Sequence, residues 1–140
     1  FAYMNTFTTT DQEGKLIQVD TRGNQVYSSL GLSPNHKIDA TTKSLVTLSE
    51  NNLNIKGIPV TLPFGDYNSP KIFYLNNTLY ISTTDKEAQK VYLFYSNGKA
   101  VEGFPVYGNG KIDLTNSDKD KALELLVTAE DNSLLVYEIN

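Results

Sequence analysis

Apolar and polar residues alternate over short segments along most of the chain. Residues 44–49 (SLVTLS), 78–83 (TLYIST) and 133–139 (SLLVYEI) are examples. Such segments are rich in Val, Ile, Leu, Tyr and Thr, which favour strands, and Asn, Asp, Gly and Ser separate them, as in tight turns. The pattern predicts an all-β fold of short strands.

The predicted strands fall into sets of three. The first set is residues 37–42, 44–49 and 52–57; the second is 71–75, 78–83 and 91–96; the third is 111–115, 123–129 and 133–139. Between strands, Asn97-Gly98 predicts a two-residue type I′ hairpin turn, because both central residues of that turn need positive φ. Asn76-Asn77 and Asp131-Asn132 are expected at equivalent turns, since both residue types tolerate that conformation.

One segment, residues 117–132 (SDKDKALELLVTAEDN), has the composition of a capped amphipathic helix. However, residues 123–137 align with residues 44–55 and 78–94, which contain alternating β-branched and Tyr residues and make poor helices. Agreement between the copies outweighs local propensity, so we predict a strand here.

The chain also repeats itself. Residues 9–26 and 83–101 share Thr-Thr-Asp, a following Glu, a Lys before an apolar strand, a Gly and a closing Val. Lys37-Ile38-Asp39 recurs as Lys111-Ile112-Asp113, 74 residues later, and Lys71-Ile72 falls between them.

A second pair of matching segments supports the same period. Gly57-Ile58-Pro59-Val60 recurs as Gly103-Phe104-Pro105-Val106. The mean spacing is close to the roughly 40 residues of a β-propeller blade. We expect a single domain over residues 1–140 with repeat units at approximately 1–35, 36–70, 71–110 and 111–140. A β-sandwich of unrelated hairpins is the alternative.

The order Gly-Phe-Pro-Val, Lys-Ile-Asp-Leu, acidic loop and "ELLVTAEDNSLLVYEI" resembles blades of FG-GAP/VCBS-type and quinoprotein-like β-propellers. The match is good over residues 98–140 and weaker toward the N-terminus. The resemblance implies about three to four four-stranded antiparallel blades. Since closed propellers have four to eight blades, it implies an incomplete propeller, cut from a larger ring or pairing as a homodimer through its open blade edge. A ring that closes with unusually few blades is the other alternative.

The amino-acid composition argues against several classes of function. The 140 residues carry a net charge of −4, and the 12 basic residues are scattered singly, which argues against nucleic-acid binding. No apolar run approaches the about 18 residues of a membrane span, so direct membrane insertion is not expected. Cysteine is absent, which excludes disulfides and thiolate metal sites. The start at Phe1 without a leader suggests a fragment or a processed product. Abundant Asn, Thr and Ser beside Tyr favour an extracytoplasmic protein.

The family resemblance also implies a calcium site in the acidic loop. Its ligand positions one, three, five and nine correspond to Asn116, Asp118, Asp120 and Glu124. Calcium prefers six to eight oxygen ligands, which alternate residues of a tight loop can supply. Asn116 replaces the usual first Asp, and Lys121 replaces the usual Gly, so a solvated acidic turn with local salt bridges is the alternative. No other cofactor is expected.

Few residues suggest catalysis. The single histidine, His36, lies in a predicted loop, and the chain lacks a phosphate-binding glycine loop and a nucleophile elbow. Tyr67 and Tyr107 lie in segments rich in Gly, Asn and Pro, and we expect them to be exposed and to contact a partner.

These observations favour a non-catalytic binding or scaffolding β-propeller segment of an exported or cell-surface protein. Its inter-blade loops would meet a protein or glycan partner. Two alternatives stay open. One is the C-terminal part of a propeller enzyme whose active site lies upstream, and the other is a β-sandwich module for carbohydrate binding or adhesion.

Overall fold

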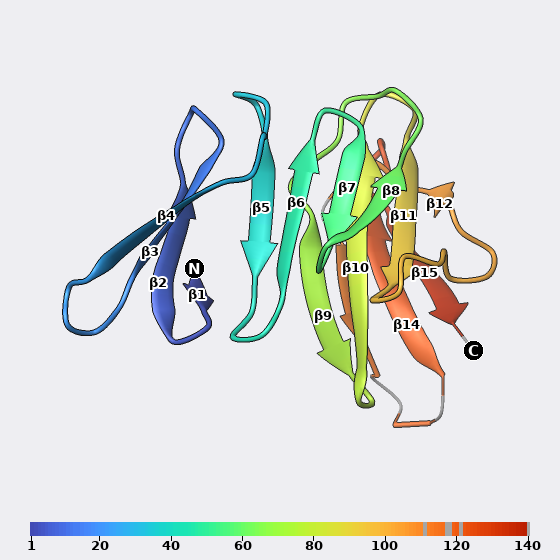
Figure 1. The fold of residues 1–140 in the computed structure, drawn as a ribbon. Coiled ribbons are helices and arrows are strands. Elements are labelled where there is room, and N and C mark those ends of the chain that lie inside the picture. Colours follow the sequence, from blue (N-terminus) through green and yellow to red (C-terminus); the bar gives the residue numbers. More distant parts are fainter. Residues whose placement is uncertain (111, 117–118, 121, 140) are drawn as a thin grey trace.

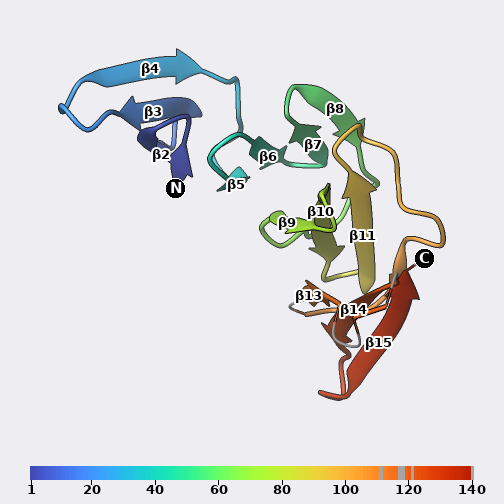
Figure 2. The same cartoon turned by 90° about the horizontal axis from the view of Figure 1, so that it is seen from below.

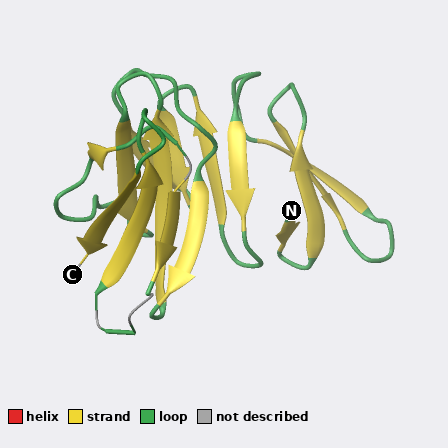
Figure 3. Cartoon of the chain, turned by 180° about the vertical axis from the view of Figure 1, so that it is seen from behind, coloured by secondary structure: helices red, strands yellow, loops and turns green. Residues whose placement is uncertain are grey.

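The chain forms four antiparallel β-sheets that follow one another along the sequence (Figure 1). The computed structural model describes residues 1–110, 112–116, 119–120 and 122–139. All regular structure in these ranges is β-strand, and Figure 3 shows only strands and loops. The described part of the chain therefore contains no helix with the length and hydropathy of a membrane span.

Each sheet is a meander of neighbouring strands. Sheet A contains β1 (Ala2–Tyr3), β2 (Thr6–Thr10), β3 (Lys15–Val19) and β4 (Gln25–Ser29). Sheet B contains β5 (Lys37–Ala40), β6 (Leu45–Ser49), β7 (Asn52–Ile55) and β8 (Ile58–Thr61). Sheet C contains β9 (Lys71–Leu75), β10 (Thr78–Asp85), β11 (Lys90–Tyr95) and β12 (Val106–Tyr107). Sheet D contains β13 (Ile112–Thr115), β14 (Leu123–Thr128) and β15 (Leu134–Ile139).

Two apolar cores hold sheets B, C and D together. The core between sheets B and C contains Val46, Leu48, Leu53 and Ile55 from sheet B with Tyr67, Ile81 and Phe94. The core between sheets C and D contains Phe73, Tyr80, Val91 and Leu93 from sheet C with Ile112, Leu114, Leu123, Leu125, Val127 and Ile139 from sheet D. Side chains alternate between the faces of a strand, so sheet C contributes one face to each core.

Polar bonds join the first strands of these three sheets. The Ile72 backbone amide of β9 donates to Asp39 Oδ2 of β5 over 2.8 Å. Lys71 of β9 donates to the Ile112 carbonyl of β13 over 3.4 Å. Sheets B, C and D form a stack. Figure 2 shows β5, β9 and β13 along one side of this stack, with the later strands β8, β11 and β15 on the other side.

The structure confirms the all-β fold and the strand predicted after the acidic loop, which is β14. Its sheets are open, and the propeller itself stays a prediction. Sheet D has three strands in its described residues rather than the four expected.

The predicted turn types need correction at Asn97-Gly98 and at Asp131-Asn132, where only Asn132 has positive φ. Asn76 and Asn77 both have positive φ, as a type I′ turn requires, but at Asn97-Gly98 only Gly98 does. The Gly98 amide donates to the Tyr95 carbonyl and Asn97 Oδ1 accepts the Lys99 amide, so a three-residue loop closes this hairpin.

Candidate functional site: the cleft between sheets A and B

Polar contacts, rather than an apolar core, join sheet A to sheet B. At one end, the Met4 amide of the β1–β2 turn donates to the Thr42 carbonyl of the β5–β6 turn over 2.8 Å. At the other end, the Ser33 amide of the segment that connects β4 to β5 donates to Ser49 Oγ of β6, also over 2.8 Å. In the same connecting segment, His36 Nε2 lies 2.6 Å from Thr10 Oγ1 of β2, which ties this segment to sheet A. The two sheets are thus fastened near their ends and stand apart between them.

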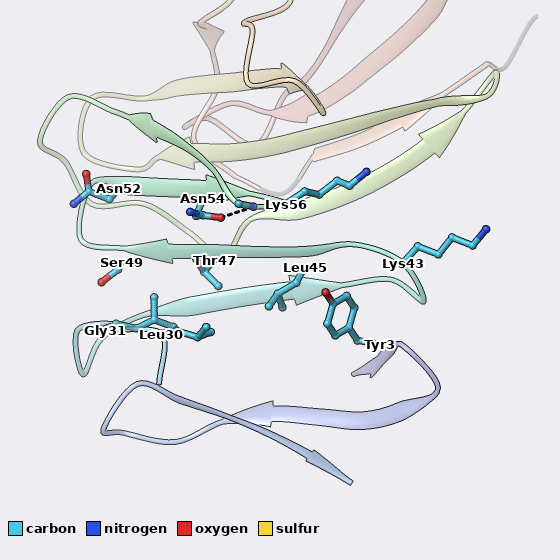
Figure 4. Close-up of a pocket in the computed structure, with 12 residues that line it drawn as sticks. Tyr3, Leu30, Gly31, Lys43, Leu45, Thr47, Ser49, Asn52, Asn54 and Lys56 are labelled. Atoms are coloured by element: carbon cyan, nitrogen blue, oxygen red, sulfur yellow. Dashed lines mark hydrogen bonds between the residues drawn. The ribbon is translucent and has the colours of Figure 1, made fainter. Parts of the chain in front are cut away.

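A cleft of about 620 Å³ occupies the space between these contacts. Its walls come from β1, the segment after β4, the β5–β6 turn, β6, β7 and the β7–β8 turn (Figure 4). The lining residues are Tyr3, Leu30, Gly31, Leu32, Lys43, Leu45, Thr47, Ser49, Asn52, Asn54, Lys56 and Gly57. Every lining side chain that bears a polar atom carries a hydroxyl, amide or ammonium group, and none is a carboxylate.

The polar wall of the cleft follows from the alternation of residues in sheet B. Along β7, Leu53 and Ile55 point into the core with sheet C, so Asn52 and Asn54 point to the opposite face. The same alternation in β6 places Thr47 toward the cleft. Sheet B therefore presents an apolar face to sheet C and, apart from Leu45, a hydrogen-bonding face to sheet A.

The β7–β8 turn fixes the position of Lys56. Lys56 and Gly57 have φ of 53° and 89°, respectively, the left-handed conformation of a tight hairpin turn. Asn54 Oδ1 accepts the Gly57 amide over 2.8 Å, and the Lys56 amide donates to the Leu45 carbonyl over 3.1 Å. The backbone at Lys56 is therefore held on both sides, while its side chain is exposed.

A second hollow adjoins the first at the same two lysines. It has a volume of about 480 Å³ and is lined by Thr41, Thr42, Lys43, Ser44, Lys56, Tyr74 and Leu79. Tyr74 is 65% exposed, and its hydroxyl donates to Asn77 Oδ1 over 3.3 Å. This hollow lies where the β5–β6 and β7–β8 turns of sheet B meet the β9–β10 hairpin of sheet C.

Positive charge dominates both hollows. Lys43 and Lys56 line each of them, and neither lining set includes Asp or Glu. The ion pairs between described residues are Lys15–Glu13 and Lys86–Asp66, so neither cleft lysine takes part in one. A concave surface lined by charge of one sign concentrates its field, and here that field is positive on a chain of net charge −4.

The two predicted partner tyrosines differ in exposure. Tyr107 is 48% exposed, as expected, and its carbonyl accepts the Tyr137 hydroxyl over 2.9 Å. The expected exposure of Tyr67 is wrong, because this ring is 3% exposed and packs in the core between sheets B and C. Its hydroxyl donates to the Pro63 carbonyl over 2.7 Å, and its ring lies 6.0 Å from that of Tyr92. Contact of either residue with a partner stays a prediction.

The environment of Tyr67 changes its acidity. Burial raises the pKa of this phenol well above its usual value, and the nearby Tyr92 and Asp85 raise it further. A tyrosine that stays protonated in this way acts as a hydrogen-bond donor in the core.

The structure describes part of the predicted calcium loop. Asn116 Nδ2 donates to the Asp120 carbonyl over 2.9 Å, and Asp120 Oδ1 accepts the Ala122 amide over 2.8 Å. Glu124 lies in β14, opposite Thr115 and Glu138, and Asp118 lies outside the described residues. Within the described ranges, no three His, Cys, Asp or Glu side chains are placed to share a metal ion. The calcium site stays a prediction.

The sequence carried a signal for the cleft that the strand predictions did not use. In residues 45–55, polar side chains at Thr47, Ser49, Asn52 and Asn54 alternate with apolar ones. A sheet packed between two others needs apolar residues on both faces, as sheet C has. The one-sided alternation of sheet B therefore marks a face without an apolar neighbour.

No protein-family model matches this chain, and the searches of curated proteins and of solved structures found no similar protein.

Proposed function

We propose that the chain is a non-catalytic binding and scaffolding segment built from β-propeller-type blades, which acts outside the cytoplasm. In this proposal the cleft between sheets A and B holds the partner, a glycan or a protein segment. The proposal depends on one observation above all: the cleft of about 620 Å³ combines hydroxyl, amide and ammonium groups with an apolar lining from the Tyr3 ring, Leu30, Leu32 and Leu45. Such groups bind polar ligands by hydrogen bonds and by contact with an aromatic face.

The rigidity of the walls supports this role. Thr47, Asn52 and Asn54 lie on paired strands whose opposite side chains fill the core with sheet C. A binding group on a packed strand keeps its position without a ligand, so little conformational entropy is lost on binding.

The scaffolding part of the proposal rests on the outer faces of the end sheets. Phe7 and Tyr27 on sheet A are 71% and 59% exposed, and Leu134 and Val136 on sheet D are 63% and 58% exposed. By alternation, these residues lie opposite the inward faces of their sheets. Large exposed apolar residues on one face favour association, and we propose that further blades or a second copy of the chain cover them.

Filling the cleft tests the proposed binding site. Asn52 is exposed at the cleft and pairs with Ser49 and Thr61 through its backbone, so Asn52→Trp places an indole there without removing a core contact. We expect this variant to lose binding to an immobilised panel of neutral and acidic oligosaccharides and extended peptides. Ser29→Trp, on the opposite face of sheet A from the cleft, is the matched control. Equal binding by wild type and Asn52→Trp would contradict the proposed site.

A further inference from the structure

The two hollows on either side of sheet B meet at Lys43 and Lys56. Each hollow includes both lysines, so the lysines join them into one surface rather than separating two sites. Tyr3 lines the first hollow and Tyr74 lines the second. An aromatic ring therefore lies in each hollow, with the ammonium groups shared between the two.

The polar groups along this surface suit a ligand with many hydroxyls. Thr47, Ser49, Asn52 and Asn54 line the first hollow, where Ser49 Oγ already bonds Ser33 and Asn54 Oδ1 already accepts the Gly57 amide, while the Asn52 side-chain amide and Asn54 Nδ2 face the ligand space. Hydroxyl and amide side chains both donate and accept hydrogen bonds, as sugar hydroxyls do. The exposed ring of Tyr74 offers a flat apolar face, which fits the C–H face of a pyranose.

The charge on the surface selects among such ligands. Two lysines without carboxylate neighbours in the linings leave a local positive charge of two. A neutral glycan leaves this charge uncompensated, whereas sugar carboxylates accept charge-assisted hydrogen bonds from the ammonium groups. The repulsion between Lys43 and Lys56 also falls when an anion lies between them.

We propose that the partner in the cleft is an acidic oligosaccharide. Its carboxylates bind Lys43 and Lys56, one sugar occupies the cleft between sheets A and B, and the next lies against Tyr74. This inference rests on the proposed function and specifies its ligand. It also moves the binding surface away from the loops of Tyr67 and Tyr107 to the turns at the other end of sheet B.

Titration calorimetry with two matched probes tests the ligand class. The probes are a hexamer of galacturonic acid and the same hexamer with every carboxylate methyl-esterified. The wild-type chain is expected to bind the acid at least about tenfold more tightly than the ester, because the ester forms no charge-assisted bonds. The preference should shrink as salt is added.

Variants of the lysines test the contacts. We expect Lys43→Gln/Lys56→Gln to bind the acid at least about tenfold more weakly. Lys90→Gln/Lys99→Gln removes the same charge from exposed positions outside both hollows and should change affinity less than about twofold. Thermal melts establish that both variants fold, since none of the four side chains is buried.

Substitution of Tyr74 distinguishes glycan binding from electrostatic attraction of any polyanion. Tyr74→Ala should weaken binding of the hexamer about fivefold and leave binding of a hexaglutamate peptide unchanged. Hexaglutamate binding as tight as that of the sugar, with no effect of Tyr74→Ala, would overturn the glycan assignment. If the ester binds as tightly as the acid and Asn52→Trp abolishes the binding of both, the assignment of an acidic ligand is wrong. The cleft then remains the proposed binding site. If neither hexamer binds, this inference is overturned, and the wider panel still tests the proposed function.

Discussion

Asp39 and Asp113 show how one residue type can contribute differently at two similar positions. Each accepts the amide of the next residue through Oδ1, at 2.9 Å for Ala40 and 3.0 Å for Leu114. Asp39 also accepts the Ile72 amide through Oδ2, which joins sheet B to sheet C. Asp113 lies on sheet D, the last sheet of the stack, and is exposed. A comparison of the two residues therefore separates the contribution of the local hydrogen bond to stability from that of the bond between sheets B and C.

We expect Asp39→Ala to destabilise the fold by about 1–3 kcal/mol, because it leaves a partly buried amide without an acceptor. Asp113→Ala removes a similar local bond and should cost about 0.5–1 kcal/mol. Urea denaturation measures both as shifts of the midpoint at an unchanged slope. Equal losses in the two variants would show that the bond between sheets B and C contributes nothing.

The buried phenol of Tyr67 makes the free energy of unfolding depend on pH in the alkaline range. Burial raises its pKa in the folded chain above the value of about 10 for an unfolded tyrosine. The folded state then holds its proton more tightly, so the stabilisation is complete below pH 10 and is lost as the pH rises beyond it. Urea midpoints between pH 9 and pH 11.5 should fall more steeply for wild type than for Tyr67→Phe. Parallel curves for the two proteins would be evidence against this assignment.

The sequence predicted the surroundings of Tyr107 better than those of Tyr67. Both lie among Gly, Asn and Pro, which indicate a loop, and loops usually lie at the surface. Residue Tyr67 forms an isolated bridge with Asp85 and reaches the core between sheets B and C. That burial depends on a contact 18 positions away in the chain, which local composition does not encode.

At the scale of elements, strand positions were predictable and turn geometry was less so. Alternation alone located β6, β7, β10, β11 and β15, whereas β14 also needed the comparison between copies, which decided strand over helix at residues 123–128. At Asn97-Gly98 the dipeptide predicted the chain reversal correctly, although the arm after it pairs through the isolated bridge of Ala100 with Phe94 rather than as a strand. The turn type was wrong, because the Asn97 side chain accepts the Lys99 amide and Gly98 alone takes the left-handed conformation.

The acidic loop before β14 carries the calcium prediction. We expect saturating calcium to raise the melting temperature by less than a few degrees, since Asn116 replaces a carboxylate and Lys121 replaces the usual Gly. Differential scanning calorimetry with and without calcium measures the shift. A large shift that Asp118→Ala abolishes would show that the loop is a strong calcium site.

At the scale of the molecule, the packing is uneven along the stack. Sheets B, C and D share two apolar cores, whereas sheet A joins sheet B through the hydrogen bond at Met4 and through the segment after β4, which bonds sheet B at Ser33 and sheet A at His36. The sequence repeats predicted similar units and therefore similar interfaces. The difference arises from the polar residues of β6 and β7, whose effect depends on which face of sheet B meets which neighbour. The same residues form the cleft on which the proposed function depends.

Amide hydrogen exchange of the full chain, with and without the galacturonate hexamer, tests the central claim most directly. Ligand held between sheets A and B should slow exchange in residues 45–57 and in the segment 30–32, since these line the cleft. Residues 63–69 and 102–110, which surround Tyr67 and Tyr107, should exchange at unchanged rates. Slowed exchange confined to those two loops, with none at the cleft, would contradict the account.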